Sequence, residues 1–336
     1  MRESLRLGSV PVAELLDRQV AGYGDRPFVT FYDDARDERV ELSYKTFDNW
    51  VHKTANLLVD ELGVGRGDRV ATVGGPHWQA SAIQFACWRV GACAVPIDLA
   101  ESAETTASIM RATGCAAAFV REERLAEVRG AAGGAAGTVV ALVADPFGNP
   151  ATDLGGAPNF SRIVLGMPDI YDGEAGSLYD DALVVLATEH APGGVVLSQT
   201  GLLTRAAAIA QRWAVDDADR AMGTLADHDV DGVVTTLLVP FGAGAGTVLN
   251  RAFNPATWWR RAADERVTVM DLTSVEAERL LAAGADGPAD EGLDLARLRM
   301  VAFEGGPPPA GLASRWQERF GLPLRHWAAP DEGGGA

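Results

Sequence analysis

The fold is decided by residues 65–97, which read GRGDRVATVGGPHWQASAIQFACWRVGACAVPI. A Gly-rich turn leads into an apolar strand that ends at Val73, and residues 77–91 have the composition of a buried helix. A second short strand, AVPI, follows at residues 94–97. Strands and helices that alternate at this length predict a parallel sheet covered by helices on both faces.

The same alternation extends outward in both directions. Towards the N-terminus we expect a helix at 11–22, a hairpin of strands 28–32 and 39–42, and a helix that begins after Ser43. Towards the C-terminus we expect strands at 182–187, 220–225, 246–249, 267–271, 298–303 and 322–325, separated by helices at 198–213, 233–238, 255–265, 275–283 and 310–320. The predicted fold class is α/β, with two consecutive lobes and largely parallel sheets.

The division between the lobes is expected near residue 177. Residues 146–177 are rich in Gly, Pro and Asp and have little periodicity, so we interpret them as a long connection. The predicted lobes are therefore residues 1–177 and 178–336. The adjacent Trp258 and Trp259 lie on an amphipathic helix, where core packing is the expected role.

Composition argues against several classes of protein. The net charge is −17 with 29 Lys and Arg residues spread along 336 positions, which disfavours binding to nucleic acid. Apolar runs stay well below the ~20 residues of a membrane helix, and the N-terminal residues lack a signal-peptide pattern. We therefore expect a cytoplasmic protein. The three cysteines, Cys87, Cys93 and Cys115, lack metal or redox spacing and are expected to be buried free thiols.

Several segments resemble one known family. They are ELSYKTF at 41–47, ANLL at 55–58, LGVGRGDRVA at 62–71, WRVGA at 88–92, GVVLS at 194–198 and FEGGPP at 303–308. In this order they resemble the N-terminal domain of adenylate-forming enzymes, the AMP-dependent acyl-CoA synthetases and peptide-synthetase adenylation domains. The likeness to short actinobacterial relatives is strongest in the first lobe. It implies carboxylate activation with ATP and Mg²⁺, which requires a cradle for phosphates and positive charge at the reacting centre.

The phosphate loop of this family, Y-T-S-G-T-T-G-x-P-K-G, is altered here. Residues 186–194 read LATEHAPGG, so Gly193 stands in place of Lys and Glu189 adds a negative charge. A like charge close to a phosphate costs about 1–4 kcal/mol, depending on the effective dielectric. Thr188, Gly193 and Gly194 are what remains of this part of a degenerate nucleotide site.

The second family motif carries a histidine, and here the segment is ADHDVDG at residues 226–232. Asp229 takes the position of that histidine, and His228 precedes it. Two interpretations stay open. The segment is a solvated acidic loop, or Asp227, His228, Asp229 and Asp231 hold a metal ion, although their spacing matches no recognised metal loop.

The third motif, Y-G-x-T-E, corresponds to AAPDE at residues 328–332. The resemblance implies that Glu332 would bind Mg²⁺, that Trp327 or His326 would stack on adenine, and that Asp331 replaces a hydroxyl. Gly305 and Gly306 would lie beside the base. As an alternative, Glu332 is an exposed residue near the chain end. Family members continue with a ribose-binding Asp and a C-terminal domain that carries a catalytic Lys, and we expect those parts to be missing.

The main hypothesis is a non-catalytic homologue that binds or scaffolds, with ATP, AMP and Mg²⁺ bound only if the degenerate site still works. Its partner would be a carrier protein, another enzyme of one pathway or a second copy, with neither nucleic acid nor membrane involved. One alternative is an enzyme with different chemistry between the lobes, using Glu189, His190, His228 and Asp229 as acid–base candidates. Another is residual adenylation completed by a C-terminal domain in trans. Hydrolase, dinucleotide and P-loop motifs are absent from the sequence.

Overall fold

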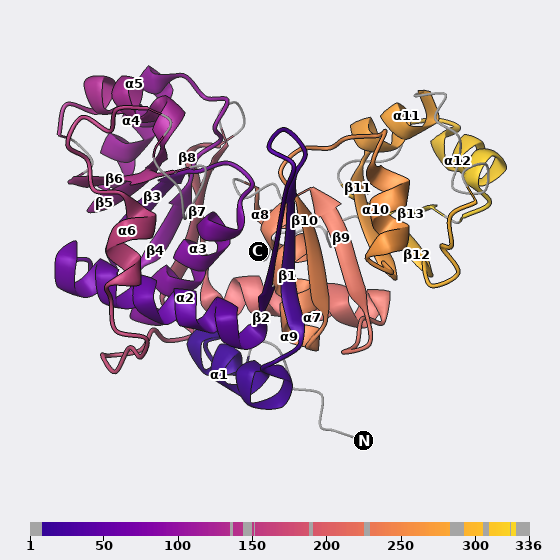
Figure 1. Cartoon of the computed structure of the whole chain (residues 1–336), viewed down its shortest axis with the longest axis horizontal. Coiled ribbons are helices and arrows are strands. Elements are labelled where there is room, and N and C mark those ends of the chain that lie inside the picture. Colours follow the sequence, from indigo (N-terminus) through magenta and orange to yellow (C-terminus); the bar gives the residue numbers. More distant parts are fainter. Residues whose placement is uncertain are drawn as a thin grey trace, which may run out of the picture.

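The computed structural model confirms the α/β class and shows two sheets in two lobes (Figure 1). It describes residues 9–134, 137–143, 150, 152–187, 191–224, 229–282, 292–304, 309–322 and 324–326. Among these residues, no helix is long and apolar enough to cross a membrane.

The first sheet, here called sheet B, has the strand order β6-β5-β3-β4-β7-β8. All neighbours are parallel except β7 and β8, which are antiparallel. Its strands are β3 (Arg69–Val73), β4 (Cys93–Pro96), β5 (Ala117–Arg121), β6 (Thr138–Leu142), β7 (Asp181–Ala187) and β8 (Ala191–Ser198). Helices α4 (Ala103–Thr113) and α5 (Glu122–Ala132) connect β4, β5 and β6.

The second sheet, sheet A, has the order β13-β12-β11-β9-β10-β1-β2. Only the hairpin of β1 (Pro27–Asp33) and β2 (Glu38–Ser43) is antiparallel. The remaining strands are β9 (Arg220–Thr224), β10 (Gly246–Asn250), β11 (Val269–Thr273), β12 (Met300–Glu304) and β13 (Leu324–His326). The helices α10 (Trp258–Asp264), α11 (Ser274–Ala282) and α12 (Leu312–Phe320) contribute to a separate core, in which Trp258 and Trp259 are buried as predicted.

Each sheet takes strands from both halves of the chain. β1 pairs in parallel with β10, so the N-terminal hairpin belongs to the sheet of the second half. Conversely, β7 pairs with β4 and joins the sheet of the first half. Figure 1 shows this exchange, with indigo β1 and β2 beside orange β10. Parallel pairing between distant strands leaves no local signal in the sequence, so the sequence alone does not predict these two pairings.

One hydrophobic core connects the two lobes. The helices α1 (Val12–Tyr23), α2 (Tyr44–Asn56) and α3 (Trp78–Val90) meet strand β1 there. Phe28 of β1 stacks on Tyr44 with ring centroids 4.6 Å apart, and Phe85 of α3 lies edge-on to Phe241 at 4.9 Å. All residues of α3 are buried, as expected for a helix with neighbours on every side.

Some local elements differ from the sequence prediction or add detail to it. The predicted long connection contains the short helix α6 (Phe160–Leu165). The predicted helix at 233–238 is a π-helical turn, η2 (Val234–Leu238), between α8 (Val230–Val233) and α9 (Val239–Ala243). A second π-helical turn, η1 (Leu57–Glu61), follows α2, and α7 (Gln199–Trp213) follows β8. The three cysteines are buried and free, as predicted.

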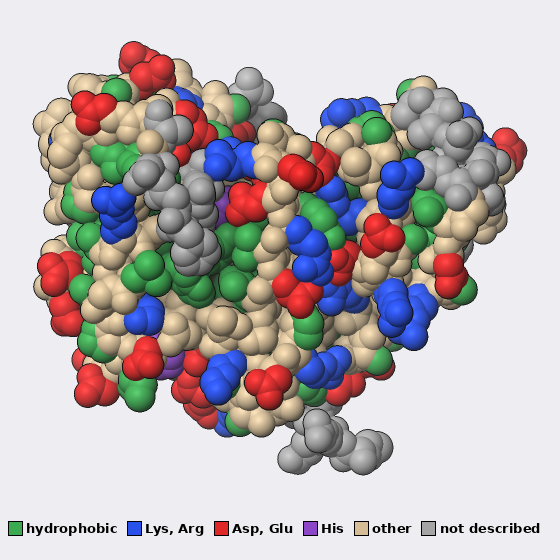
Figure 2. Space-filling model, viewed as in Figure 1, with side chains coloured by type: hydrophobic (Ala, Val, Ile, Leu, Met, Phe, Trp, Pro, Cys, Tyr) green, Lys and Arg blue, Asp and Glu red, His purple; other side chains and the backbone are tan. Residues whose placement is uncertain are grey.

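The space between the lobes is visible at the surface. Figure 2 shows a notch between them and a patch of hydrophobic side chains beside the β1–β2 hairpin, near the centre of this face. Acidic and basic side chains alternate over the rest of the face, without a continuous basic stripe.

Candidate functional site

Ligands of open α/β sheets bind outside the carboxyl ends of the strands. In this protein the segments that follow β7, β9, β11 and β12 are therefore the first places to look for a site. They are also the places where the resemblance puts the altered motifs.

The segment that corresponds to the phosphate loop lies between β7 and β8. Only residues 188–190 separate the two strands, which pair from Asp181↔Ser198 to Ala187↔Ala191. Gly193 and Gly194 are part of β8, and Gly194 has a positive φ of 68° where the register shifts. A glycine suits such an irregularity, because other residues rarely adopt that backbone conformation.

The acidic segment after β9 leads into α8. Asp229 is the N-cap of α8, and its carboxylate accepts a hydrogen bond from the backbone N–H of Gly232 at 3.3 Å. Asp231 forms an ion pair with Arg205 of α7. Burial raises the pKa of Asp231, and the nearby Asp229 carboxylate adds to this effect. Asp229 thus has a capping role in this structure.

Asp271 of β11 is a buried carboxyl group whose oxygens make no hydrogen bond of good geometry, although the Thr235 hydroxyl and the Leu272 backbone lie close enough to lower its pKa in part. The residue is 7% exposed. It lies between Ala302 of β12 and Gly223 of β9, where a Cβ would lie 2.8 Å from Cγ2 of Thr236 and 3.6 Å from Cβ of Asp271, so Asp271 is closely packed on that side. Burial raises its pKa to about 7, and the carboxylates of Glu276 and Asp231 contribute in the same direction.

Sequence reasoning missed Asp271, although a signal exists. It interrupts the apolar run VTVMDL at residues 267–272, and an ionisable residue inside a buried strand is uncommon unless it is paired. Perturbed carboxyl groups of this kind cluster at functional sites.

Most of the other predicted site residues lie outside the described residues. These are Thr188, Glu189, His190, Asp227, His228, Gly305, Gly306, Trp327, Asp331 and Glu332. Their proposed roles in nucleotide, metal or acid–base chemistry therefore stay predictions.

In the described part of the chain, three potential metal ligands come together elsewhere. Asp17, Asp48 and His52 have ligand atoms within 4.8 Å of one another on α1 and α2. Arg89 of α3 binds both carboxylates, at 2.8 and 3.0 Å. A guanidinium between the carboxylates indicates an ion-pair cluster that joins three helices.

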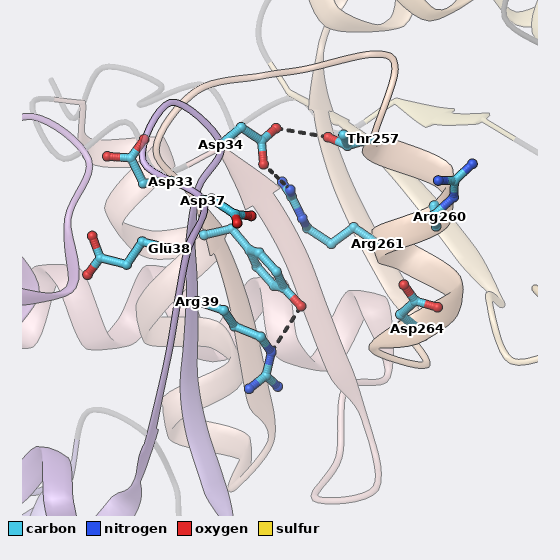
Figure 3. A pocket seen from close by; sticks show the side chains of 10 residues that line it. Asp33, Asp34, Asp37, Glu38, Arg39, Thr257, Arg260, Arg261 and Asp264 are labelled. Carbon is cyan, nitrogen blue, oxygen red and sulfur yellow. Dashed lines mark hydrogen bonds and ion pairs between the residues drawn. The ribbon is translucent and has the colours of Figure 1, made fainter.

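A cavity of about 260 Å³ lies between the β1–β2 hairpin and α10 (Figure 3). Arg261 contributes its guanidinium to Asp34 and to Asn250, and it stacks on the ring of Tyr32 at 4.1 Å. Asp34 also accepts a hydrogen bond from Thr257 at 2.9 Å. Because these groups satisfy one another, the cavity is best explained as the joint between hairpin and helix.

Fold and site geometry together define a class of protein, the two-lobed N-terminal domain of adenylate-forming enzymes. The chain belongs to the AMP-binding enzyme family, whose model matches residues 16–329. A protein of Mycobacterium tuberculosis is 37% identical over 246 residues, which cover 72% of this chain and 90% of that protein. The putative acyl-CoA synthetase YngI of Bacillus subtilis is 23% identical over 93% of this chain and 59% of its own length.

Solved structures agree on the fold. The N-terminal domain of FACL13 from Mycobacterium tuberculosis superposes with a TM-score of 0.81 at 17% identity, over 96% of this chain and 76% of that one. The anthranilate CoA ligase AuaEII superposes with a TM-score of 0.78 at 18% identity, over 94% of this chain and 58% of that one. The chain thus spans somewhat more than half of the longer ligases.

Proposed function

We propose that this protein is a non-catalytic member of its family, a binding or scaffolding module that has lost ATP-dependent adenylation. The observation that carries the proposal is the connection between β7 and β8. Three residues replace the glycine- and hydroxyl-rich phosphate loop, no lysine is present between residues 186 and 194, and Glu189 is acidic. The partner we propose is a carrier protein or another enzyme of one pathway.

The chemistry of the β7–β8 connection supports the proposed loss of nucleotide binding. Phosphate loops work because consecutive backbone N–H groups and a lysine face the polyanion. Here only three residues connect β7 to β8, and no lysine stands among residues 186–194.

Calorimetric titration of the chain with ATP–Mg²⁺ and with AMP tests the proposal. We expect no binding at millimolar nucleotide and no carboxylate-dependent release of pyrophosphate. A variant with residues 188–193 replaced by the family loop should gain nucleotide affinity. Its matched control is a loop of the same length made of Gly and Ser without Lys. Pyrophosphate release by the unmodified chain would refute the proposal.

The second candidate is an enzyme with different chemistry, and Asp271 is the observation that favours it. A buried carboxyl group with a pKa of about 7 has the properties of a general acid or base near neutral pH. If so, turnover of a carboxylate, thioester or amine substrate would change with a midpoint near pH 7. Asp271→Asn would abolish turnover, while binding of that substrate would persist.

A further inference from the structure

Three basic side chains from both lobes meet between the sheets, and neither the family motifs nor the proposed function uses them. They are His77, which precedes α3, Arg121 at the end of β5 and Arg251 immediately after β10. We call them the interlobe basic cluster. Arg121 Nε and an Arg251 guanidinium nitrogen lie 3.3 and 3.6 Å from the same atom, Oε1 of Glu123. His77 packs against Phe31 of β1, with centroids 4.7 Å apart.

The protonation of His77 follows from its contacts. The backbone N–H of Gln79 donates to Nδ1 at 3.2 Å, so Nδ1 is an acceptor. Burial, together with Arg121 and Arg251, lowers the pKa of His77 well below its usual range. The neutral ring therefore carries its proton on Nε2, a donor that is buried and has no partner.

The two arginines add further unused donors. The side chain of Arg121 is 3% exposed, and its Nη1 is buried without a hydrogen bond. Nη1 of Arg251 lies 3.3 Å from Asp33 Oδ2 but lacks hydrogen-bond geometry. Burial and the neighbouring Arg251 lower the pKa of Arg121, while Glu123 and Glu122 act in the opposite direction. Glu123, the carboxylate that both arginines share, is 44% exposed.

Unsatisfied buried donors cost about 1–3 kcal/mol each, and more when they are charged. Here the unused groups are all donors, so only an acceptor can satisfy them. An oxyanion offers several acceptor oxygens, and arginine side chains match its geometry. Asp33 and Glu123 balance the charges of the two arginines and His77 is neutral, so the unused donors, rather than a net positive charge, are what an anion would bind.

We propose that the interlobe basic cluster binds an oxyanion, either a carboxylate or a phosphate, between the two lobes. Arg121 and His77 contact it from the first lobe and Arg251 from the second. Because the groups belong to different sheets, the bound anion fixes the lobes relative to each other. None of the three residues belongs to the altered family motifs, so the test of this proposal does not depend on the outcome for adenylation.

Nuclear magnetic resonance of ¹⁵N-histidine-labelled protein tests the proposal, because the chain has five histidines. His77→Asn assigns the His77 signals. We expect millimolar inorganic phosphate, and also acetate, to shift the Nε2 resonance of His77 at constant ionic strength, whereas chloride leaves it unchanged. Comparing phosphate with acetate distinguishes the sources. A larger shift with phosphate points to a phosphate ligand, and a larger shift with acetate points to a carboxylate.

The matched variants are Arg251→Met and Arg124→Met, whose arginines are 22% and 17% exposed. Arg124 binds the carbonyl oxygens of Leu99 and Glu101, and so is already satisfied. We expect Arg251→Met to weaken phosphate binding about tenfold or more, the effect of one charge-assisted hydrogen bond, and Arg124→Met to leave it unchanged. Absence of any anion-induced shift of His77 in the unmodified protein would overturn the proposal, since bridging water would then satisfy the donors. So would equal shifts with chloride.

Discussion

Two buried charged side chains near sheet A, Arg261 of α10 and Asp271 of β11, differ in what surrounds them. Arg261 is 7% exposed and bonds Asp34 and Asn250 while it stacks on Tyr32. Asp271 has the same exposed fraction, and neither of its oxygens makes a hydrogen bond of good geometry. A buried charge with partners is part of the architecture, whereas one without them costs stability and is retained for another reason. We therefore assign Arg261 a structural role and treat Asp271 as a candidate functional residue.

Removing the paired charge should have the largest effect. Arg261→Met leaves Asp34 and Asn250 without their partner, and we expect a loss of about 3 kcal/mol in the free energy of unfolding. Chemical denaturation measures it. The neighbouring Arg260 is exposed, so Arg260→Met should change stability by less than about 0.5 kcal/mol. Equal losses in both variants would mean that the pairing of Arg261 is not what stabilises the joint.

Removing the unpaired charge of Asp271 should stabilise the folded protein, whereas removing the paired charge of Arg261 should destabilise it. The folded-state pKa of Asp271, about 7, lies above the ordinary value of 3.8. The folded state thus binds a proton that the unfolded state lacks between these values, and stability falls as pH rises from about 4 to 7. Asp271→Asn should remove this slope and raise the free energy of unfolding at pH 8, measured by denaturation across the pH range. A loss of stability at pH 8 would show that the carboxylate has a stabilising partner.

Asp229 provides an intermediate case, because its carboxylate is partnered but near the surface. As the N-cap of α8, it should contribute about 1 kcal/mol, lost in Asp229→Ala and largely retained in Asp229→Ser. Thermal unfolding of both variants checks this. If Asp229→Ser were as destabilised as Asp229→Ala, or if added Mg²⁺ stabilised only the unmodified chain, the carboxylate would act as more than a cap.

The smallest effect is expected at the three cysteines. Burial keeps their thiols neutral, so none of them needs a charged partner. Burial raises the pKa of Cys93 to about 12 and that of Cys87 further. We therefore expect no thiol to react with a thiol-specific disulfide reagent in the native protein, and three to react after denaturation. Rapid labelling of the native chain would show that this core opens.

The sequence predicts local elements better than their partners. The hairpin and α3 follow from hydrophobic spacing and turn residues, and both are present. The pairing of β1 with β10 depends on contacts far apart in the chain, so hydrophobic spacing alone could not predict it. The altered motifs were recognised from residue types alone. Asp271 and the interlobe basic cluster emerge only when the strands are placed side by side.

The exchange of strands between the halves has a consequence for synthesis. The β1–β2 hairpin leaves the ribosome about 200 residues before β10, which at 5–20 residues per second is a delay of about 10–40 s. Throughout that time one edge of β1 has no partner and invites pairing with other chains. Neither lobe can finish folding alone, so nascent chains should depend on chaperones until the second half has emerged.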